Sequence, residues 1–195
     1  ETFYNFKLNK AAGDLILANN VNIDNVFTML VGDVVAGSNR LTLGIDVSSI
    51  GSLSYTGGTI IGAFERWLNA TTTNYLFPIG TSSAYRPATV SFNTLSNGSL
   101  IATFEATTPG NNGLSLTDAA QGIYNTYTEG YWTLTPDNSL SSTDYDLDLN
   151  GTGMSSYTID ASTRLLTRAN SSLDWTAVGT HQAAVTPVVS RNNIT

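Results

Sequence analysis

The chain has 195 residues, of which 41% are hydrophobic but only 12% are charged, about half the ~25% typical of soluble domains. Fifteen acidic residues against eight basic ones give a net charge of −7. This balance excludes the Lys and Arg clusters that bind phosphate backbones or anionic lipids. We therefore expect no nucleic-acid partner. We also expect no membrane insertion, because no apolar run approaches the ~20 residues that span a bilayer.

Cysteine is absent, which removes disulfides, thiolate metal sites and a cysteine nucleophile from consideration. Ser, Thr, Asn and Gly are abundant, as is typical of strands with polar outer faces joined by tight turns. The composition predicts an all-β protein and fits an exported bacterial chain. Because Glu1 opens directly into a strand-like sequence with no signal peptide, we expect a processed chain or a piece of a longer one.

Residues 1–62 contain short apolar segments separated by Asn, Asp and Gly. Examples are Phe6–Leu8, Leu15–Leu17 and Val21–Ile23, with turn residues such as Asn19-Asn20 between them. Short strands with tight corners and inward aliphatic side chains are typical of a β-solenoid. The sequence predicts solenoid-like repeats here, with a meandering antiparallel sheet as the alternative.

Residues 63–195 show longer alternating segments and predict an antiparallel β-sandwich. Asn97-Gly98 predicts a hairpin that brings Phe92 and Phe104 onto neighbouring strands. Leu116–Ile123 is expected to hold no more than a helical turn. Further strands are expected at the segments 130–136, 144–150, 157–159, 165–168 and 175–178.

Alternating acids mark one candidate metal site. Asp144, Asp146 and Asp148 repeat at every second residue, so their carboxylates share one strand face, and Ca²⁺ is the cation that such oxygen ligands suit. A straight strand spreads its ligands along a line, however, and no closing glutamate follows. The alternative is a solvated acidic face that discourages aggregation at a sheet edge.

No motif for catalysis stands out, and we expect the protein not to be an enzyme. His181 is the only histidine, and no Gly-x-Ser-x-Gly elbow accompanies it.

Aromatic residues raise the possibility of carbohydrate binding, because sugar rings stack on exposed aromatic faces. Tyr131 and Trp132 are adjacent in an alternating strand, so one of them is expected to point outward, where it is a candidate glycan contact. Core packing is the alternative role for both.

Several segments, taken in order, resemble modules of large secreted surface proteins of Bacteroidetes-type bacteria, many of which use the type IX secretion route. The matching segments are Thr2–Lys10, Gly37–Gly44, Phe77–Thr81, Tyr85–Val90, Glu129–Pro136 and Gly179–His181. The resemblance implies extracellular or cell-surface display, often in tandem arrays that serve adhesion, gliding or matrix formation. It implies no catalytic residues.

Such modules usually continue beyond the Gly-Thr-His region, so the sandwich is expected to lack a strand. The apolar segment at the other terminus, with Thr2, Phe3, Tyr4, Phe6 and Leu8, is a candidate subunit-pairing strand. Together these features predict a structural or adhesive subunit that pairs with copies of itself or neighbouring repeats, with filaments as one form. In-chain pairing of the same segment is the alternative. A carbohydrate-binding module of a secreted protein is the alternative function.

Overall fold

The computed structural model describes residues 1–195 and contains strands but no helix. Its strands, in chain order, are β1 (Thr2–Asn9), β2 (Leu15–Ile16), β3 (Val21–Val31), β4 (Val34–Leu43), β5 (Ser52–Tyr55), β6 (Ile60–Leu68), β7 (Tyr75–Phe77), β8 (Gly80–Thr81), β9 (Ala84–Tyr85), β10 (Ala88–Phe92), β11 (Gly98–Glu105), β12 (Leu116–Asp118), β13 (Gln121–Ile123), β14 (Tyr131–Asp137), β15 (Tyr145–Asn150), β16 (Thr180–Val185) and β17 (Val188–Ile194). The all-β class predicted from the composition is confirmed.

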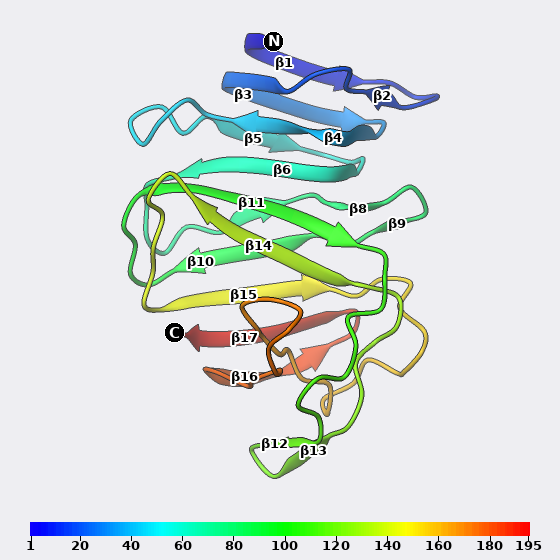
Figure 1. The fold of residues 1–195 in the computed structure, drawn as a ribbon. Helices are drawn as coiled ribbons and strands as arrows, with labels where there is room; N and C mark the ends of the chain where they lie inside the picture. Colours follow the sequence, from blue (N-terminus) through cyan, green and yellow to red (C-terminus); the bar gives the residue numbers. More distant parts are fainter.

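Most strands belong to one of two sheets (Figure 1). The larger has eight strands in the order β1-β3-β4-β6-β11-β14, with β2 on β4 and β5 on β3. The smaller has five strands in the order β16-β17-β15-β10-β7. Two short hairpins, β8-β9 and β12-β13, complete the fold.

Strands β1 to β6 pair in parallel and form a solenoid-like stack, as the sequence predicts. Thr2 pairs with Asn22, and Val21 pairs with Leu41, so successive turns of the chain repeat at twenty residues. The apolar segments lie within the strands, and exposed polar residues such as Asn19-Asn20 lie at the corners between them. The strands are longer than the apolar segments suggest, since β3 has 11 residues and β4 has 10, and their aliphatic side chains fill the inside of each turn.

Aromatic rings run through the inside of this stack. The ring centroids of Phe6 and Phe27 lie 6.0 Å apart, those of Phe27 and Phe64 6.4 Å, and those of Phe64 and Phe77 6.0 Å. Their tilted and edge-on arrangements are the ones that the aromatic quadrupole favours. The rings form an aromatic ladder that connects the N-terminal end of the stack to the antiparallel half.

Parallel pairing gives way to antiparallel pairing at β6. One edge of β6 pairs in parallel with β4, and its other edge pairs antiparallel with β11. Both sheets contribute to one core of 27 buried hydrophobic residues. The division into residues 1–62 and 63–195 stays a prediction, but its boundary lies within β6, so the two regions share a strand and a core.

A buried carboxylate lies where the two regions meet. Glu65 on β6 is almost fully buried, and its side chain pairs with the Arg40 guanidinium, with 3.1 Å between Oε2 and Nε. The hydroxyls of Thr42 and Ser99 donate to the same carboxylate over 3.0 and 2.6 Å. Because a buried charge is costly unless it is paired and hydrogen-bonded, this network fixes β4, β6 and β11 in one arrangement.

The predicted hairpin at Asn97-Gly98 is wrong. β10 pairs with β7 and β15, whereas β11 pairs with β6 and β14, so the chain crosses between the sheets at this point. Gly98 is instead required because a side chain there would clash with the backbone of Leu140. Phe92 and Phe104 lie in different sheets but share the common core.

Two further local predictions are corrected. Leu116–Ile123 forms the β12-β13 hairpin and no helical turn. The segments 157–159, 165–168 and 175–178 form no strands but belong to the long connection 151–179, whose only bridge joins Thr167 to Thr176. Ile159 and Leu165 are buried there. Their apolar character reflects packing of the connection onto the sandwich rather than strand formation.

Candidate functional site

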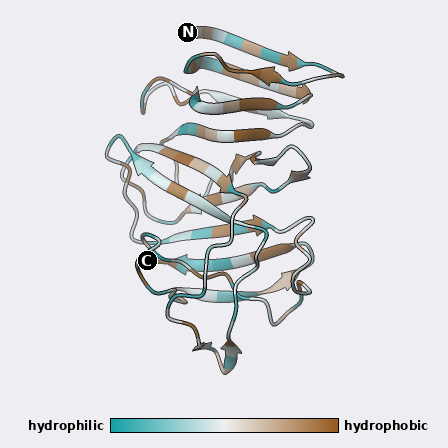
Figure 2. Cartoon of the chain, turned by 45° about the vertical axis from the view of Figure 1, so that its right-hand side comes forward, coloured by the Kyte–Doolittle hydropathy of each residue, from teal (hydrophilic) through white to brown (hydrophobic).

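The predicted pairing strand lies at the open end of the solenoid. Its residues Thr2, Phe3, Tyr4, Phe6 and Leu8 all belong to β1, which pairs in parallel with β3 of its own chain. In-chain pairing, the alternative that the sequence left open, is therefore what the structure contains. The other edge of β1 has no strand partner, and no strand lies beyond it in Figures 1 and 2.

Apolar side chains are uncovered at this end. Leu8 is buried and Phe6 is half-buried, but Tyr4 is 70% exposed and Ile16 on β2 is 73% exposed. Phe3 stacks against Phe6 with 5.2 Å between ring centroids, which extends the aromatic ladder to the surface. A hollow of about 220 Å³ opens here and is lined mainly by Phe3, Phe6, Leu15, Ile16, Leu17, Val21, Val34 and Leu41. We call this end of the molecule the open solenoid end.

Side-chain hydrogen bonds hold β1 in place despite its exposure. The Asn5 side-chain oxygen accepts from Asn25 Nδ2 over 3.0 Å and from the backbone N–H of Val26 over 3.2 Å. Both donors belong to β3. The bonds hold β1 against β3 at one of the two places where the register of their pairing shifts, between Phe3 and Asn5.

The three candidate calcium ligands lie along β15 and just before it. Asp144 and Asp146 accept hydrogen bonds from Asn93 Nδ2 over 3.1 and 3.4 Å, and Asp146 also accepts from the backbone N–H of Asn193 over 2.9 Å. Asp148 is exposed. The structure places no group of three or more acidic or histidine side chains for a metal, and calcium binding stays a prediction.

The two candidate glycan contacts, Tyr131 and Trp132, both line one cavity of about 350 Å³. The indole N–H of Trp132 donates to the backbone carbonyl of Arg86 over 2.8 Å, and its ring packs edge-on against Phe104 at 5.1 Å. Trp132 therefore serves the core and the cavity wall together. The packing role is therefore present, and contact with a glycan stays a prediction.

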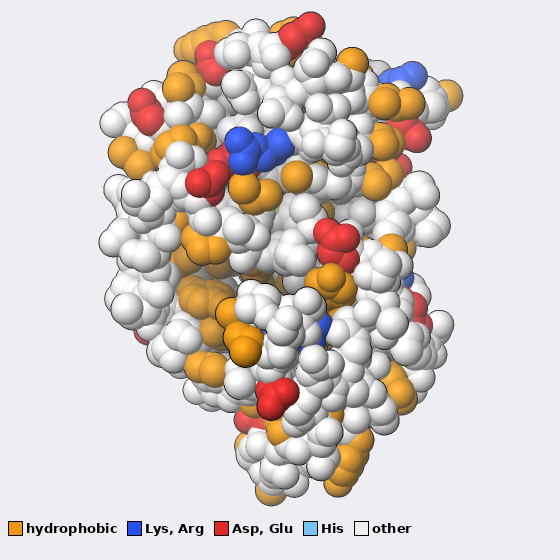
Figure 3. Space-filling model, in the orientation of Figure 1, with side chains coloured by type: hydrophobic (Ala, Val, Ile, Leu, Met, Phe, Trp, Pro, Cys, Tyr) orange, Lys and Arg blue, Asp and Glu red, His pale blue; other side chains and the backbone are white.

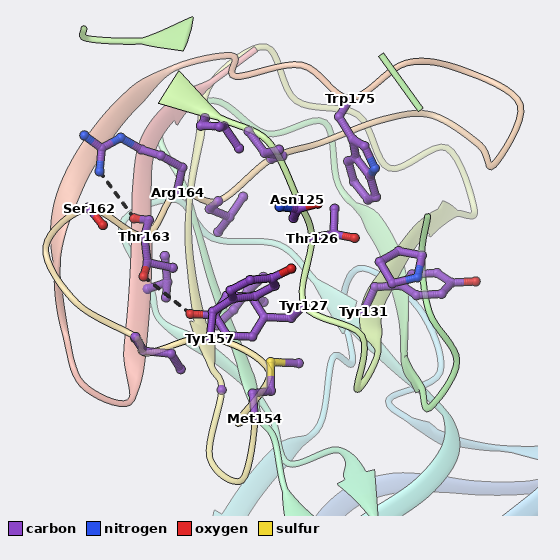
Figure 4. Close-up of a pocket in the computed structure, with 18 of the residues that line it drawn as sticks. Asn125, Thr126, Tyr127, Tyr131, Met154, Tyr157, Ser162, Thr163, Arg164 and Trp175 are labelled. Carbon is purple, nitrogen blue, oxygen red and sulfur yellow. Dashed lines mark hydrogen bonds between the residues drawn. The ribbon is translucent and has the colours of Figure 1, made fainter. Parts of the chain in front are cut away.

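Two long connections complete the cavity. The segment 106–130 contributes Tyr124 and Tyr127, and the segment 151–179 contributes Tyr157 and Trp175. Figure 4 labels Tyr127, Tyr157 and Trp175 around this space. We call this space the aromatic cavity. Sequence reasoning missed these four residues, because their segments were interpreted as connections or core strands. The sequence offers little local signal for them, because residues 106–130 contain only two tyrosines and residues 151–179 only one.

Buried ionic contacts fix these connections. Arg191 on β17 is fully buried and donates to both carboxylate oxygens of Asp118 over 2.8 and 3.1 Å. The same guanidinium donates to four backbone carbonyls, those of Leu165, Ala177, Val178 and Gly179. The hydrogen bonds from Arg191 hold the pKa of the Asp118 carboxyl below its usual range.

The segment 151–179 is also fastened at its start. Glu129 accepts from the backbone N–H groups of Ser155 and Ser156, both over 2.6 Å, and from the hydroxyls of the same serines. Partial burial opposes ionisation, but the hydrogen bonds from Ser156 and Ser155 outweigh it and lower the pKa of Glu129 to about 2. Glu129 therefore acts as an ionised anchor for one wall of the aromatic cavity.

His181 lies beside the Asp118 cluster. Its Nε2 lies 3.3 Å from the Ala161 carbonyl. Burial lowers the pKa of His181, and the nearby charge of Arg164 lowers it further. Neither His181 nor any carboxylate lines the aromatic cavity.

Comparisons with protein-family models, curated proteins and solved structures find no match to this chain. The structure contains no helix that could cross a membrane. The face drawn in Figure 3 is mostly uncharged, and its Lys and Arg side chains do not join into a continuous patch. The candidate sites are therefore argued from their own geometry: a free strand edge at one end of the molecule and an aromatic cavity between connections.

Proposed function

We propose that this chain is a structural or adhesive module of an extracellular bacterial surface assembly, and that copies join through the open solenoid end. The extracellular placement rests on the resemblance to secreted surface modules described above. The assembly role rests mainly on one observation. The outer edge of β1 is unpaired and lies over an apolar interior that no other segment of the chain covers.

An edge of this kind favours pairing. Free strand edges offer unpaired N–H and C=O groups, and soluble proteins usually protect them with charges, prolines or bulges. Solenoids also end in repeats with a polar outer face. β1 carries a single charged residue, Lys7, and the side chains of Tyr4 on β1 and Ile16 on β2 are both exposed. Covering these apolar side chains with a partner strand would remove them from water.

A second copy of the chain is the partner that we propose. The solenoid has one open end, because β6 continues into the antiparallel sheet. Solenoid-to-solenoid contact would therefore join only two copies. Filaments require β1 to meet a different edge, and β16 offers one near the other end of the molecule, where Val185 is 77% exposed (Figure 1). Head-to-tail pairing of β1 with β16 repeats without closing and generates a filament.

Sedimentation and negative-stain microscopy of the purified chain test this proposal. We expect concentration-dependent filaments for the natural sequence and monomers for the double variant Tyr4→Lys/Ile16→Lys. Both substituted side chains are already largely exposed, so the variant should fold. Val185→Lys should also block filaments. Ile45→Lys, at an exposed loop position away from both edges, is the matched control and should assemble normally.

A monomeric natural chain at all concentrations would refute the proposal, as would equal assembly by the double variant. Closed dimers that survive Val185→Lys but not Tyr4→Lys/Ile16→Lys would refute the head-to-tail filament. They would replace it with head-to-head pairing of two β1 edges.

A further inference from the structure

We infer that the aromatic cavity is a binding site for a neutral saccharide. This inference goes beyond assembly through β1 and does not depend on it. The cavity is formed by the connections 106–130 and 151–179, which lie toward the end of the molecule opposite β1 (Figures 1 and 4). Its volume of about 350 Å³ falls within the roughly 300–1,000 Å³ usual for small-molecule sites.

Six aromatic side chains contribute to the walls. Tyr127 and Tyr157 meet edge-on with 5.6 Å between ring centroids, and Tyr157 is 45% exposed. Tyr124 is 67% exposed at the rim. Most other rings of this protein pack into its core, so exposed rings gathered around one cavity need a separate explanation. A saccharide ring has C–H groups on its faces, and these pack on an aromatic ring while the hydroxyls at its edge remain free for hydrogen bonds.

The other lining groups suit those hydroxyls. Amide and hydroxyl side chains, including Gln121, Asn125, Thr158 and Ser162, lie among the aromatic rings. Such groups both donate and accept, as sugar hydroxyls do. Two of these groups already donate within the chain: Gln121 Nε2 to the Gly122 carbonyl over 3.0 Å, and the Ser162 hydroxyl to Asp160 over 2.6 Å. Their remaining hydrogen-bonding capacity is what suits a sugar hydroxyl.

The charge of the lining separates a saccharide from other ligands. Arg164 is the only charged residue in the wall, and it is nearly buried, with its Nε 3.3 Å from the Asp118 carboxylate. A phosphate or a polyanion would need free cations or a helix N-terminus, and the cavity offers neither. Hydrolysis of a glycoside would need two carboxylates across the bond, and none lines the cavity. The chemistry therefore favours binding of an uncharged sugar without cleavage.

The walls are ordered before any ligand arrives. The Trp175 indole N–H donates to the Gly110 carbonyl over 2.9 Å, and the Arg168 guanidinium lies over its ring at 4.1 Å from the centroid. The Tyr127 hydroxyl lies 3.5 Å from the Thr163 hydroxyl. A wall that is already fixed loses little conformational entropy on binding, which raises affinity for a small ligand.

Titration with uncharged oligosaccharides, observed by NMR, tests the inference. The probes are trisaccharides of glucose, galactose, mannose and N-acetylglucosamine. The three indole N–H signals report separately, because Trp132 and Trp175 line the cavity and Trp67 on β6 does not. We expect saturable shifts of the Trp132 or Trp175 signal with at least one probe, while the Trp67 signal stays unchanged.

Two variants localise the binding. Tyr124→Ala and Tyr157→Ala should each raise the Kd roughly 5- to 10-fold, which corresponds to about 1–1.4 kcal/mol for one lost aromatic contact. Tyr4→Ala is the matched control, because Tyr4 is as exposed as Tyr124 but lies at the open solenoid end. It should bind the probe as the natural chain does. Proton NMR spectra of each variant check that the fold is retained.

The inference would be overturned if none of the probes moved the Trp132 or Trp175 signal in the folded chain. It would also be overturned if binding were equally weakened by Tyr4→Ala, or if the cavity bound only an apolar dye such as anilinonaphthalene sulfonate. These results leave the assembly proposal untouched, since sedimentation tests that separately.

Discussion

The two halves of this molecule reach order by different means. The solenoid half repeats its backbone at about twenty residues and fills its inside with a ladder of apolar side chains. The antiparallel half contains two long connections, which depend on single polar anchors such as Arg191 and Glu129. In the solenoid half, the end strand β1 can stay ordered while exposed because it pairs along its length with β3. The connections have little strand pairing of their own, so the loss of one anchoring side chain should destabilise a whole connection.

The largest effect is expected for Arg191→Met, which removes the anchor of the antiparallel half. Four backbone carbonyls would lose their donor, and Asp118 would keep only its contact with Arg164. Breaking a buried pair in this way should lower the free energy of unfolding by about 3–5 kcal/mol. Urea denaturation measures this loss, with the exposed Lys7→Met as control. A loss below about 1 kcal/mol would mean that Arg191 does not organise the connections.

A smaller effect is expected for Phe27→Leu in the solenoid and Phe92→Leu in the antiparallel half. Each removes part of a buried ring and should cost about 1–2 kcal/mol. Because β6 and the core are shared, both variants should shift one common unfolding transition. Circular dichroism and tryptophan fluorescence, followed through the same denaturation, measure this. Two transitions that respond separately would instead support independent domains at 1–62 and 63–195.

Glu129→Gln should cost about 1 kcal/mol at pH 7, because hydrogen bonds to a charged acceptor become weaker neutral ones. The pKa of Glu129 in the folded chain, about 2, is lower than the ordinary value of 4.5. The ionised group therefore stabilises the fold above about pH 4.5, and this contribution is lost as the pH falls towards 2. Denaturation at pH 7 and pH 2.5 should show the difference between the natural chain and the variant shrinking in acid.

The exposed Asp14→Asn is the control for this comparison, because its carboxylate accepts no hydrogen bond from another segment. A difference at Glu129→Gln that stays constant from pH 7 to pH 2.5 would contradict the role of the ionised anchor.

The smallest effect concerns the acidic strand face. Asp146 already accepts bonds from Asn93 and Asn193, and Asp148 faces solvent. We expect millimolar Ca²⁺ or a chelator to change the Tm by less than about 1 °C, because a ligand stabilises a fold only as far as it binds the folded state. A rise of several degrees with Ca²⁺ that Asp148→Asn removes would establish the calcium site instead.

The sequence predicted what depends on local patterns. Short apolar segments predicted the solenoid, and alternation over 144–150 predicted the strand that forms as β15. Local patterns also misled. Asn97-Gly98 has the residues of a tight turn, yet the chain crosses between the two sheets there. The glycine serves a different purpose, since a side chain at position 98 would clash with the backbone of Leu140.

The aromatic cavity could not be predicted as a unit. Its residues Tyr124, Tyr157 and Trp175 come from segments with no regular period, and only tertiary contacts bring them together. Arg191 gave no signal either, because its partner Asp118 is 73 residues away in the sequence. Sequence reasoning located Tyr131 and Trp132 because they belong to an alternating strand, but not the connections that complete the site.

Hydrogen exchange of the β1 backbone tests assembly through the open solenoid end most directly. Amide exchange is measured strand by strand on dilute and concentrated samples of the natural chain. The account predicts that concentrating the chain slows exchange in β1 and β16 and leaves the central strand β15 unchanged, because pairing protects only the free edges. Exchange in β1 that remains equally fast at every concentration would contradict the account.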